Sequence, residues 1–193
     1  MNKPYIICHM MSAVDGRIDC GMTEKIQGVK EYYATLNELK ATAFVSGKVT
    51  AELEMALPGK FQAQNMEALS EEGFSKKGQA ASYNVVVDTQ GALLWKKDND
   101  KQSTLLIITS EKVTKEYLAY LDDKNISWIA CGKEHIDLVR ASEILHDEFG
   151  VERMAIVGGG HINAGFLDAG LLDEVSVLLG PAIDGRGGMA AMF

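Results

Sequence analysis

The stretch Met154-Ala-Ile-Val-Gly-Gly-Gly-His-Ile-Asn-Ala-Gly-Phe-Leu-Asp-Ala-Gly170 decides how the rest of the chain is interpreted. A short apolar run stops at three glycines, and a helical pattern then continues to Gly170, where a helix end commonly has glycine. The pattern predicts a strand that leads directly into a helix. Within that helix we expect Ile162, Phe166 and Leu167 to face the core and Asn163 to serve as a cap.

The three glycines also suit a ligand. Glycine lets backbone N–H groups approach a bound group closely, and a helix N-terminus adds partial positive charge, so phosphate is the expected guest. The spacing is not the dinucleotide fingerprint, because Asn163 stands where a third glycine is required. On these residues alone, a tight turn without a ligand remains the alternative, since turns are the commonest use of glycine.

Length and composition indicate one soluble domain, residues 1–193. Hydrophobic residues make up 47% and charged residues 24% of the chain, and no apolar run is long enough to span a membrane. The net charge of −8 (19 basic minus 27 acidic residues), without a basic block, argues against nucleic-acid binding. Three cysteines without a CxxC pair, and an amino terminus unlike a signal peptide, predict reduced thiols and a cytoplasmic protein.

Apolar runs alternate with helical patterns along the chain. The predicted strands are 5–11, 42–46, 83–88, 105–109, 126–130, 154–157 and 171–180, and the predicted helices are 30–40, 116–121 and 137–149. This alternation predicts an α/β fold with a mostly parallel central sheet and helices on both faces. The helix over 30–40 is expected to turn Tyr33 and Leu36 toward the core. Residues 58–82 are interpreted as a polar excursion with a helix start at 70–72, and 92–95 as a segment that pairs back or crosses the end of the sheet.

Polar groups follow two of the predicted strands. Ser12 and Asp15 follow the first, where open α/β sheets place ligand groups, although an ordinary Asp-Gly turn explains them equally. Gly47 and Lys48 follow the second and suit a phosphate, with a solvated turn as the alternative. A P-loop is excluded, because the upstream glycine is missing and Val49 replaces the required Ser or Thr.

Other catalytic patterns are absent from the sequence. Cys8 and His9 are adjacent on a strand and point to opposite faces, and no other His, Cys and carboxylate spacing indicates a metal, so none is expected. Gly-x-Ser-x-Gly is absent, which leaves a nucleophile elbow unsupported. His161 either contacts a ligand beside the glycines or is an exposed or capping residue.

Taken together, the motifs occur in one order. They are Met11-Ser-Ala-Val-Asp-Gly-Arg17, Ala43-Phe-Val-Ser-Gly-Lys-Val-Thr50, Val85-Val-Val-Asp88, Ile107-Ile-Thr-Ser110, and Ile156-Val-Gly-Gly-Gly160 through Leu171-Leu-Asp-Glu174 to Gly180-Pro181. This set resembles the reductase domain of the bacterial bifunctional riboflavin-biosynthesis protein, a relative of dihydrofolate reductase, over nearly the whole chain.

The resemblance implies a dihydrofolate-reductase-like fold that binds NADPH across the carboxyl ends of the strands. The residues that it implies for the cofactor are Gly47, Lys48, Thr50, Ser110, Val157, Gly158, Gly159, Gly160, His161 and Ile162. Those that it implies for the substrate are Ser12, Asp15, Gly16 and Glu174, and Asp15 is the predicted catalytic residue. The reaction would reduce a pyrimidine- or pteridine-like small molecule, as the riboflavin enzyme reduces a ribosylamino-pyrimidine, and the protein is expected to be a homodimer.

The chain also departs from the family pattern. Val157 stands where a Glu is usual, residues 18–29 lack the usual tryptophan, and the carboxy-terminal strand expected beyond Gly188 is missing, so strand pairing there is predicted to be incomplete. The deaminase domain of the bifunctional protein is absent, which leaves at most the reduction. The competing hypotheses are an NADP(H)-binding protein of the same fold without reductase activity, and a structural or interaction protein without cofactor affinity.

Overall fold

The computed structural model describes residues 2–18 and 20–193. The strands are β1 (Tyr5–Ala13), β2 (Ala43–Gly47), β3 (Gly73–Ser75), β4 (Ser82–Val87), β5 (Ser103–Thr109), β6 (Ser127–Ala130), β7 (Arg153–Gly158) and β8 (Glu174–Gly180). The helices are α1 (Cys20–Thr23), α2 (Val29–Glu38), α3 (Lys48–Glu54), α4 (Lys115–Asp123), α5 (Leu138–Asp147) and α6 (Gly160–Asp168).

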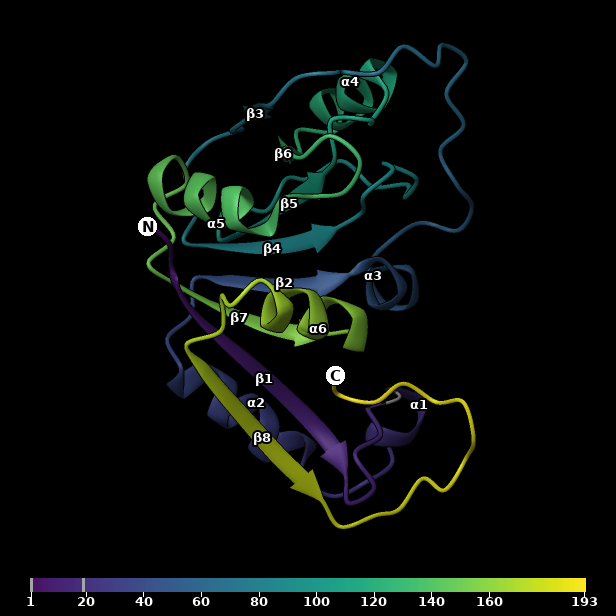
Figure 1. Cartoon of the computed structure of the whole chain (residues 1–193), viewed down its shortest axis with the longest axis vertical. Helices are drawn as coiled ribbons and strands as arrows, with labels where there is room; N and C mark the ends of the chain where they lie inside the picture. Colours follow the sequence, from purple (N-terminus) through teal and green to yellow (C-terminus); the bar gives the residue numbers. More distant parts are fainter. Residues whose placement is uncertain (1, 19) are drawn as a thin grey trace.

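The strands form one twisted sheet in the order β3-β6-β5-β4-β2-β7-β1-β8 (Figure 1). Of the strand pairings that the structure describes, only that of β3 with β6 is antiparallel. Because parallel strands present their carboxyl ends at one edge, the segments that follow β1, β2, β4, β5, β6 and β7 come together there. The predicted mostly parallel α/β sheet is therefore confirmed.

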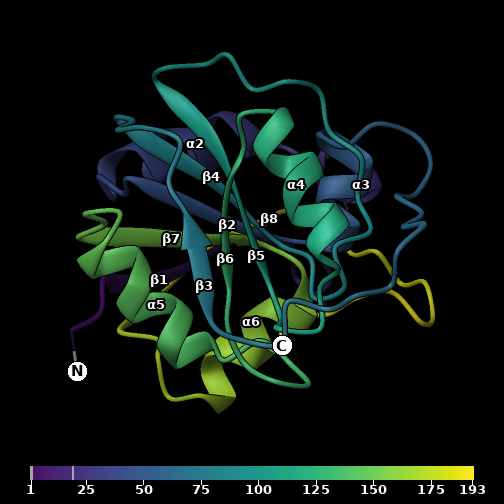
Figure 2. The ribbon, with the colours of Figure 1, turned by 90° about the horizontal axis from the view of Figure 1, so that it is seen from above.

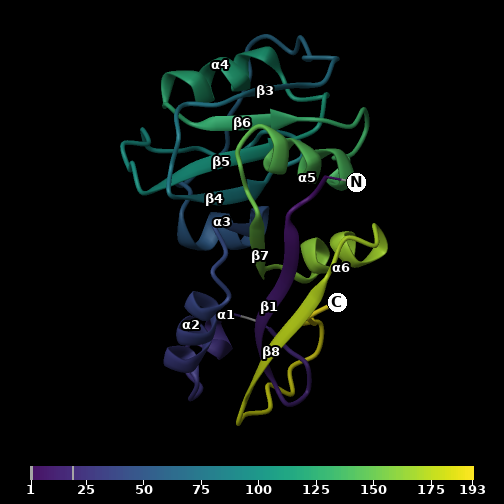
Figure 3. The same cartoon turned by 90° about the vertical axis from the view of Figure 1, so that its left-hand side faces the viewer.

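Helices cover both faces of this sheet. Seen from above, α2, α3 and α4 lie on one face while α5 and α6 lie on the other (Figure 2). The side view shows the same two layers with the sheet between them (Figure 3). Burial on both faces explains the near-continuous apolar runs of the central strands, such as Val85-Val-Val87.

Two helices cover the sheet as the sequence predicts. The α5 side chains Ile144 and Leu145 are buried with Phe149, which follows the helix. On the other face, Tyr117 and Leu121 of α4 are fully buried. These helices thus bury one apolar stripe each against the sheet, at roughly 25 cal/mol per Å² of apolar surface removed from water.

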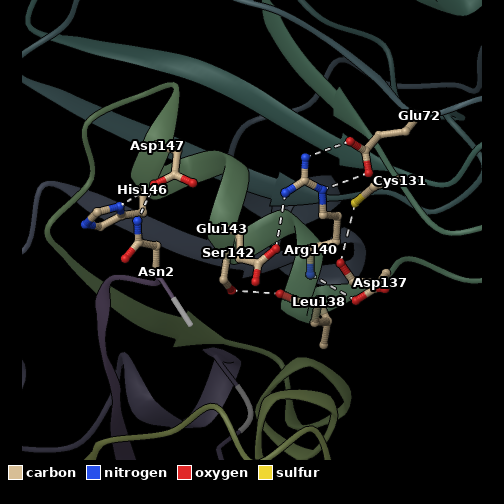
Figure 4. A network of polar contacts seen from close by, with 10 residues as sticks. All are labelled: Asn2, Glu72, Cys131, Asp137, Leu138, Arg140, Ser142, Glu143, His146 and Asp147. Carbon is tan, nitrogen blue, oxygen red and sulfur yellow. Dashed lines mark hydrogen bonds and ion pairs between the residues drawn. The ribbon is translucent and has the colours of Figure 1, made fainter.

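Polar contacts hold the amino-terminal part of α5 (Figure 4). Asp137 is the N-cap, and its carboxylate accepts a hydrogen bond from the Arg140 amide at 3.0 Å. The Arg140 guanidinium in turn donates two hydrogen bonds of 2.9 Å to the carboxylate of Glu72, and this pairing lowers the pKa of Glu72. This bidentate pair ties the polar excursion to α5.

The helix α2 forms as predicted, but its apolar side chains are not buried in the core. It spans Val29–Glu38, close to the predicted bounds, but none of its residues is buried, and the Tyr33 side chain is 59% exposed. The expectation that this aromatic stripe faces the core is wrong. The period of the stripe identifies the helix correctly, but it does not say whether the apolar face packs on the sheet or lines a cavity.

The junction of β7 and α6 forms as predicted. Gly159 is the N-cap of α6 with φ +90°, and Gly170 follows the helix with φ +66°. Phe166 is buried, but Leu167 is 49% exposed, so its predicted inward position is wrong. Asn163 does not cap the helix: it lies buried inside α6, and its amide donates to the Met192 carbonyl at 2.7 Å.

The segment before β4 differs from its prediction in detail. The strand β3 is three residues long and pairs with β6 at the sheet edge, which the polar composition of 58–82 did not indicate. Residues 70–72 form no helix, and Ser70 has φ +64°. Segment 92–95 contributes an isolated bridge between Leu94 and Leu57. Such short pairings depend on partner strands that are far along the chain, so the local sequence does not predict them.

At the other end of the sheet, β8 pairs with β1 alone among the described strands. Beyond it, residues 181–193 form no strand and run back toward α6 (Figure 1). A single bridge, between Arg17 and Ala191, attaches this segment antiparallel to the loop after β1. The predicted incomplete pairing after β8 is therefore what the described residues show.

Candidate functional site

A cavity of about 1100 Å³ runs along the carboxyl edge of the sheet. Its lining residues fall into two groups, named here by their position. The junction end comprises the segments after β2, β4, β5, β6 and β7, and the α2 end comprises β1, α1 and α2 with the loops that follow β1 and α1. The cavity is therefore formed where the topology brings six strand ends together.

Two strand-to-helix junctions interlock at the centre of the junction end. A Cβ added at Gly47, between β2 and α3, would lie 2.7 Å from Ile162 of α6. Conversely, a Cβ added at Gly158, at the end of β7, would lie 3.0 Å from Thr50 Oγ1 of α3. Each glycine thus makes room for a β-branched side chain of the other junction, which holds the two helix starts together.

A β-bulge aims β7 into the cavity. Val45 pairs with Ile156, but Ser46 pairs with Gly158, so Val157 is the extra residue. Bulges of this kind re-aim a side chain and are common beside active sites. Val157 accordingly lines the cavity together with Gly158, Gly159, Gly160 and His161.

Lys48 lies beside a buried carboxylate, that of Asp88. Lys48 Nζ lies 3.9 Å from Asp88 Oδ1, and Asp88 is only 1% exposed. The other oxygen, Oδ2, accepts hydrogen bonds from the Ala92 and Leu93 amides at 2.7 and 2.9 Å, whereas Oδ1 is buried without a hydrogen-bond partner. Both residues line the cavity, so a buried acceptor and a cation stand side by side at its wall.

Ser110 lines the cavity as predicted but has its own partner. The side chain is 1% exposed, and its hydroxyl donates to the Thr89 carbonyl at 2.9 Å. To donate to a phosphate, the hydroxyl would have to leave this carbonyl. Farther out, Lys112 and Glu134 form an exposed ion pair at the rim of the junction end.

The carboxy-terminal segment contacts the start of α6. A Cβ at Gly160 would lie 2.4 Å from the Ala191 carbonyl oxygen, and Ala190 lines the cavity. Gly160 is thus required for close approach of the protein's own backbone. The ten predicted cofactor residues nevertheless come together here, since all ten line the cavity. Ile162 also packs on Gly47.

The α2 end is mainly apolar. Its lining residues are Met10, Met11 and Ile18 from β1 and the loop after it, Thr23 and Glu24 at the end of α1, and Val29, Tyr32, Tyr33 and Leu36 from α2. Facing residues of α3 that line the same cavity are Val49, Leu53 and Glu54. The exposed apolar side chains of α2 and α3 therefore line the cavity, where a ligand can cover them.

A buried histidine holds α2 on the sheet. His9 is fully buried, its ring stacks on Tyr32 at a centroid distance of 4.5 Å, and Nε2 donates to the Tyr32 carbonyl at 3.1 Å. Nδ1 then accepts from the Ser176 hydroxyl at 3.0 Å. Burial lowers the pKa of His9, which favours the neutral ring that this pattern requires.

The residues predicted to act on the substrate are not brought into the cavity. Asp15 is exposed, and its carboxylate accepts hydrogen bonds from the Gly185 and Asp184 amides at 2.9 and 3.4 Å. The Gly185 amide foremost holds the pKa of Asp15 below its usual value, which makes it a poor proton donor. Gly16 only provides the turn, at φ +78°.

The two remaining substrate residues also lie apart from the cavity lining. Ser12 is 2% exposed and donates to the Ala13 carbonyl at 2.7 Å. Glu174 begins β8 at the amino end, opposite the cavity edge, and accepts a hydrogen bond from the Tyr5 hydroxyl at 3.2 Å. The implied substrate set is therefore dispersed by the structure, while the implied cofactor set is assembled.

Sequence patterns did not indicate several residues that line the cavity. Asp88 follows β4 directly, as Ser110 follows β5, so the strand-end rule could have found it. The α2 residues could have been found only by knowing that α2 stands off the core. Among residues 2–18 and 20–193, no group of three His, Cys, Asp or Glu could hold a metal, and no described helix has the length and apolarity to cross a membrane.

Comparison with known proteins places these features in context. The family model described as the RibD C-terminal domain matches residues 4–193. The curated 2,5-diamino-6-ribosylamino-4(3H)-pyrimidinone 5′-phosphate reductase of Methanothermobacter thermautotrophicus is 36% identical over 87 residues, which are 45% of this chain and 39% of that protein.

Solved structures share the fold. RibD of Acinetobacter baumannii superposes with a TM-score of 0.68 and 18% identity over 100% of this chain and 50% of that one. A pyrimidine reductase-like protein of Corynebacterium diphtheriae gives a TM-score of 0.68 and 17% identity over 100% of this chain and 80% of that one. The chain thus spans 39% of the length of the curated relative and 50% of the Acinetobacter baumannii RibD chain. It shares the fold of the solved structures, which is the dihydrofolate-reductase-like fold that the resemblance implied.

Proposed function

The chain belongs to the RibD C-terminal domain family, and from this premise we propose that it is an NADPH-dependent reductase of a pyrimidine- or pteridine-like small molecule. The observation that carries the proposal is one continuous cavity with two unlike ends. The junction end has glycine-lined helix starts and a cation, and the α2 end has apolar walls of the kind that pack on a flat ring. The acceptor of the archaeal relative, a ribosylaminopyrimidine 5′-phosphate, is the first compound to test.

The residues of the junction end fit a nicotinamide dinucleotide. Gly159, at φ +90°, brings backbone without a side chain to the cavity wall, and the nine-residue helix α6 starts beside it. Asp88 Oδ1 is a buried acceptor without a hydrogen-bond partner, suited to a hydroxyl group. When bound, the reduced nicotinamide supplies a hydride.

The chain's own residues would position and shield the reaction. The glycines hold the dinucleotide backbone, and Val157 with the apolar side chains of the α2 end excludes water from the acceptor. Reduction of a C=N bond adds a hydride to carbon and a proton to nitrogen. Asp15 is not part of this proposal, because its carboxylate is held charged by the loop amides outside the cavity.

Lys48 tests the choice of cofactor. A charge-assisted contact to a 2′-phosphate contributes roughly 1.5–3 kcal/mol, so Lys48→Ala should weaken NADPH binding by about 10- to 100-fold and leave NADH binding nearly unchanged. Nicotinamide fluorescence on titration measures both constants. Lys115→Ala is the control, since Lys115 pairs with Glu67 outside the cavity. Equal losses for the two cofactors would remove Lys48 from the phosphate site.

Turnover separates the reductase from the competing function. Loss of the reduced nicotinamide absorbance upon addition of an acceptor supports reduction. Tight NADPH binding without turnover of any pyrimidine or pteridine would instead favour an NADP(H)-binding protein that lacks this activity. No cofactor affinity would favour a structural protein.

We further propose a cytoplasmic homodimer. Cys8 and Cys131 are free and buried, which suits a reducing compartment. The strand β8 is a sheet edge whose Val175, Val177 and Leu179 side chains are 48%, 39% and 66% exposed on one face. A second copy can satisfy this edge by antiparallel pairing of the same strand about a two-fold axis.

A further inference from the structure

One side chain of the cavity wall, Tyr32 of α2, is held in three ways by a single buried residue of β1. Its ring stacks on the His9 ring, with the centroids 4.5 Å apart and the planes 14° from parallel. Its carbonyl accepts a hydrogen bond from His9 Nε2 at 3.1 Å, and its hydroxyl donates to the His9 carbonyl at 3.4 Å. Tyr32 lines the cavity, whereas His9 is fully buried and does not. His9 therefore acts on the cavity through Tyr32.

The position of Tyr32 determines how α2 is turned about its axis. Val29 and Leu36 stand three positions before and four positions after Tyr32, so the three side chains share one face of the helix. All three line the cavity, as does Tyr33. No residue of α2 is buried, so burial of an apolar stripe, which orients most surface helices, contributes little here. The contacts of Tyr32 with His9 thus select the side chains that α2 presents to the cavity.

The start of α2 is attached to the sheet at a separate point. A Cβ added at Gly28, the N-cap residue, would lie 2.9 Å from Leu178 of β8 and 3.2 Å from Met11 of β1. This close approach fixes the distance between the helix start and the sheet. It does not fix the rotation of the helix, because glycine has no side chain that could oppose rotation.

A hydroxyl group of the neighbouring strand orients the His9 ring. Ser176 of β8 is the Cα partner of His9 in the sheet, and its Oγ lies 3.0 Å from His9 Nδ1. The Tyr32 carbonyl can only accept a hydrogen bond, so Nε2 carries the ring proton and Nδ1 accepts from Ser176. The opposite tautomer would place two acceptors, Nε2 and the Tyr32 carbonyl, against each other. The Ser176 hydroxyl favours the tautomer that holds α2.

We propose that His9 is a positioning residue of the reductase. It fixes the rotation of α2, so that the apolar side chains of this helix form the wall on which the ring of the acceptor packs, and Ser176 keeps His9 in the tautomer that this requires. The inference rests on the proposed reductase function and names residues that shape the acceptor end of the same site. His9 transfers no proton and touches neither cofactor nor acceptor.

The first test is His9→Phe, which keeps a ring for stacking but removes both nitrogens. With NADPH and the ribosylaminopyrimidine 5′-phosphate of the archaeal relative, we expect KM for the acceptor to rise by about 10-fold and kcat to change by less than about 3-fold. The dissociation constant of NADPH should not change, because the junction end is formed by other elements. An unchanged acceptor KM, or an equal loss of NADPH affinity, would overturn the inference and leave the reductase function standing.

His9→Gln is the conservative variant that should restore function. Its side-chain amide can reach the position of Nε2 and donate to the Tyr32 carbonyl, although it lacks the ring. We expect the acceptor KM of this variant to lie within about 3-fold of the parent value. A KM as high as that of His9→Phe would show that the hydrogen bond to the carbonyl does not position α2.

A matched pair of serine variants separates positioning from general stability. Ser176→Ala removes the partner of Nδ1 and should raise the acceptor KM by about 3- to 10-fold. Ser142→Ala is the control, because Ser142 is fully buried in α5, on the other face of the sheet, and donates to the Leu138 carbonyl at 2.7 Å (Figure 2). Its acceptor KM should equal that of the parent. Equal KM values for the two variants would contradict the role of Ser176.

Nuclear magnetic resonance reads the tautomer directly. The nitrogen-15 shifts of His9 should show a protonated Nε2 and an unprotonated Nδ1 in the parent protein at neutral pH, and a mixture of tautomers in Ser176→Ala. A proton on Nδ1 in the parent would contradict the assigned hydrogen bonds and overturn the inference.

Hydrogen exchange of the ligand-free protein tests the inference without an acceptor. Amides of α2 should exchange about 10-fold faster in His9→Phe than in the parent, while those of α4 keep the parental rate. If the parent reduces no acceptor, this comparison decides alone. Faster exchange confined to α2 supports the positioning role although the reductase function has failed, whereas unchanged exchange, or faster exchange throughout the molecule, overturns it.

Discussion

At the scale of single residues, Gly159 has the most demanding backbone. Its φ of +90° is disfavoured for every residue with a Cβ, but the space around it is open, since an added Cβ would lie 3.9 Å from Thr50 Oγ1. Gly159→Ala should therefore lower the free energy of unfolding by about 1–2 kcal/mol through backbone strain without a steric clash. Urea unfolding of the ligand-free protein measures it.

The matched control is Gly187→Ala, because Gly187 has no heavy atom within 4 Å of an added Cβ and no positive φ. That variant should be neutral or slightly stabilising. If Gly159→Ala is equally neutral, the junction does not hold its φ in solution. The strain also means that loss of NADPH binding in Gly159→Ala must be corrected for the unfolded fraction.

The hydrogen bonds of Asp15 predict that the conformation of the loop after β8 depends on pH. The Gly185 and Asp184 amides lower its pKa in the folded protein below the ordinary value of 3.8. A lowered folded pKa means that the contribution of this carboxylate is present above 3.8 and is lost only as the pH falls through the lower value. NMR titration of the Gly185 amide should thus show a midpoint below 3.8 that is absent in Asp15→Asn. A midpoint at or above 3.8 would contradict the clamp.

At the scale of elements, α5 allows the contribution of a helix cap to stability to be compared with that of a surface ion pair. Asp137→Ala removes the acceptor of the Arg140 amide and should cost about 1 kcal/mol of stability. Arg140→Gln removes the exposed pair with Glu72 and should cost less than about 1 kcal/mol, because exposed ion pairs contribute little. Thermal unfolding of both variants ranks them, and a larger loss in Arg140→Gln would reverse their assigned importance.

Elements were predictable where local sequence determines them. The glycine junction of β7 and α6, the helix α5 and the alternation of strands with helices all follow from periodicity and from residues next to one another. The short strand β3 and the outward face of α2 depend on partners far along the chain. For α2, the decisive contact is the His9 ring stacked on Tyr32, which the period of the helix itself does not contain.

The residues of the candidate site likewise differ in how far local sequence determines their position. The position of residues 47–50 and 157–162 at one cavity could be predicted, because close backbone approach leaves a glycine signature. The position of Asp15 could not be predicted, because a carboxylate after a strand can turn either to the cavity or to a neighbouring loop. Here it accepts hydrogen bonds from the loop amides of Asp184 and Gly185. Glu174 does not line the cavity, because β8 begins, and does not end, at that residue.

At the scale of the whole molecule, the β8 edge predicts the oligomeric state. Leu179 lies on the edge strand that pairs in the proposed dimer, and its side chain is 66% exposed, so Leu179→Lys should shift the protein toward monomer by placing a charge among the side chains that the paired strands bring together. Light scattering after size exclusion measures the mass at several concentrations. Glu174→Gln, at the amino end of the same strand, is the control that should remain dimeric. A monomeric parent protein would refute the dimer directly.

The interlock of the two junctions limits how the family can vary. Gly47 leaves room for Ile162, and Gly158 leaves room for Thr50, although the two members of each pair are more than a hundred positions apart in the chain. A larger residue at one position requires a smaller one at its partner, because the two backbones are held by the sheet. We therefore expect residue volumes at 47 and 162, and at 50 and 158, to be inversely correlated among homologues, and independent variation at these positions would show that the helix starts can shift apart.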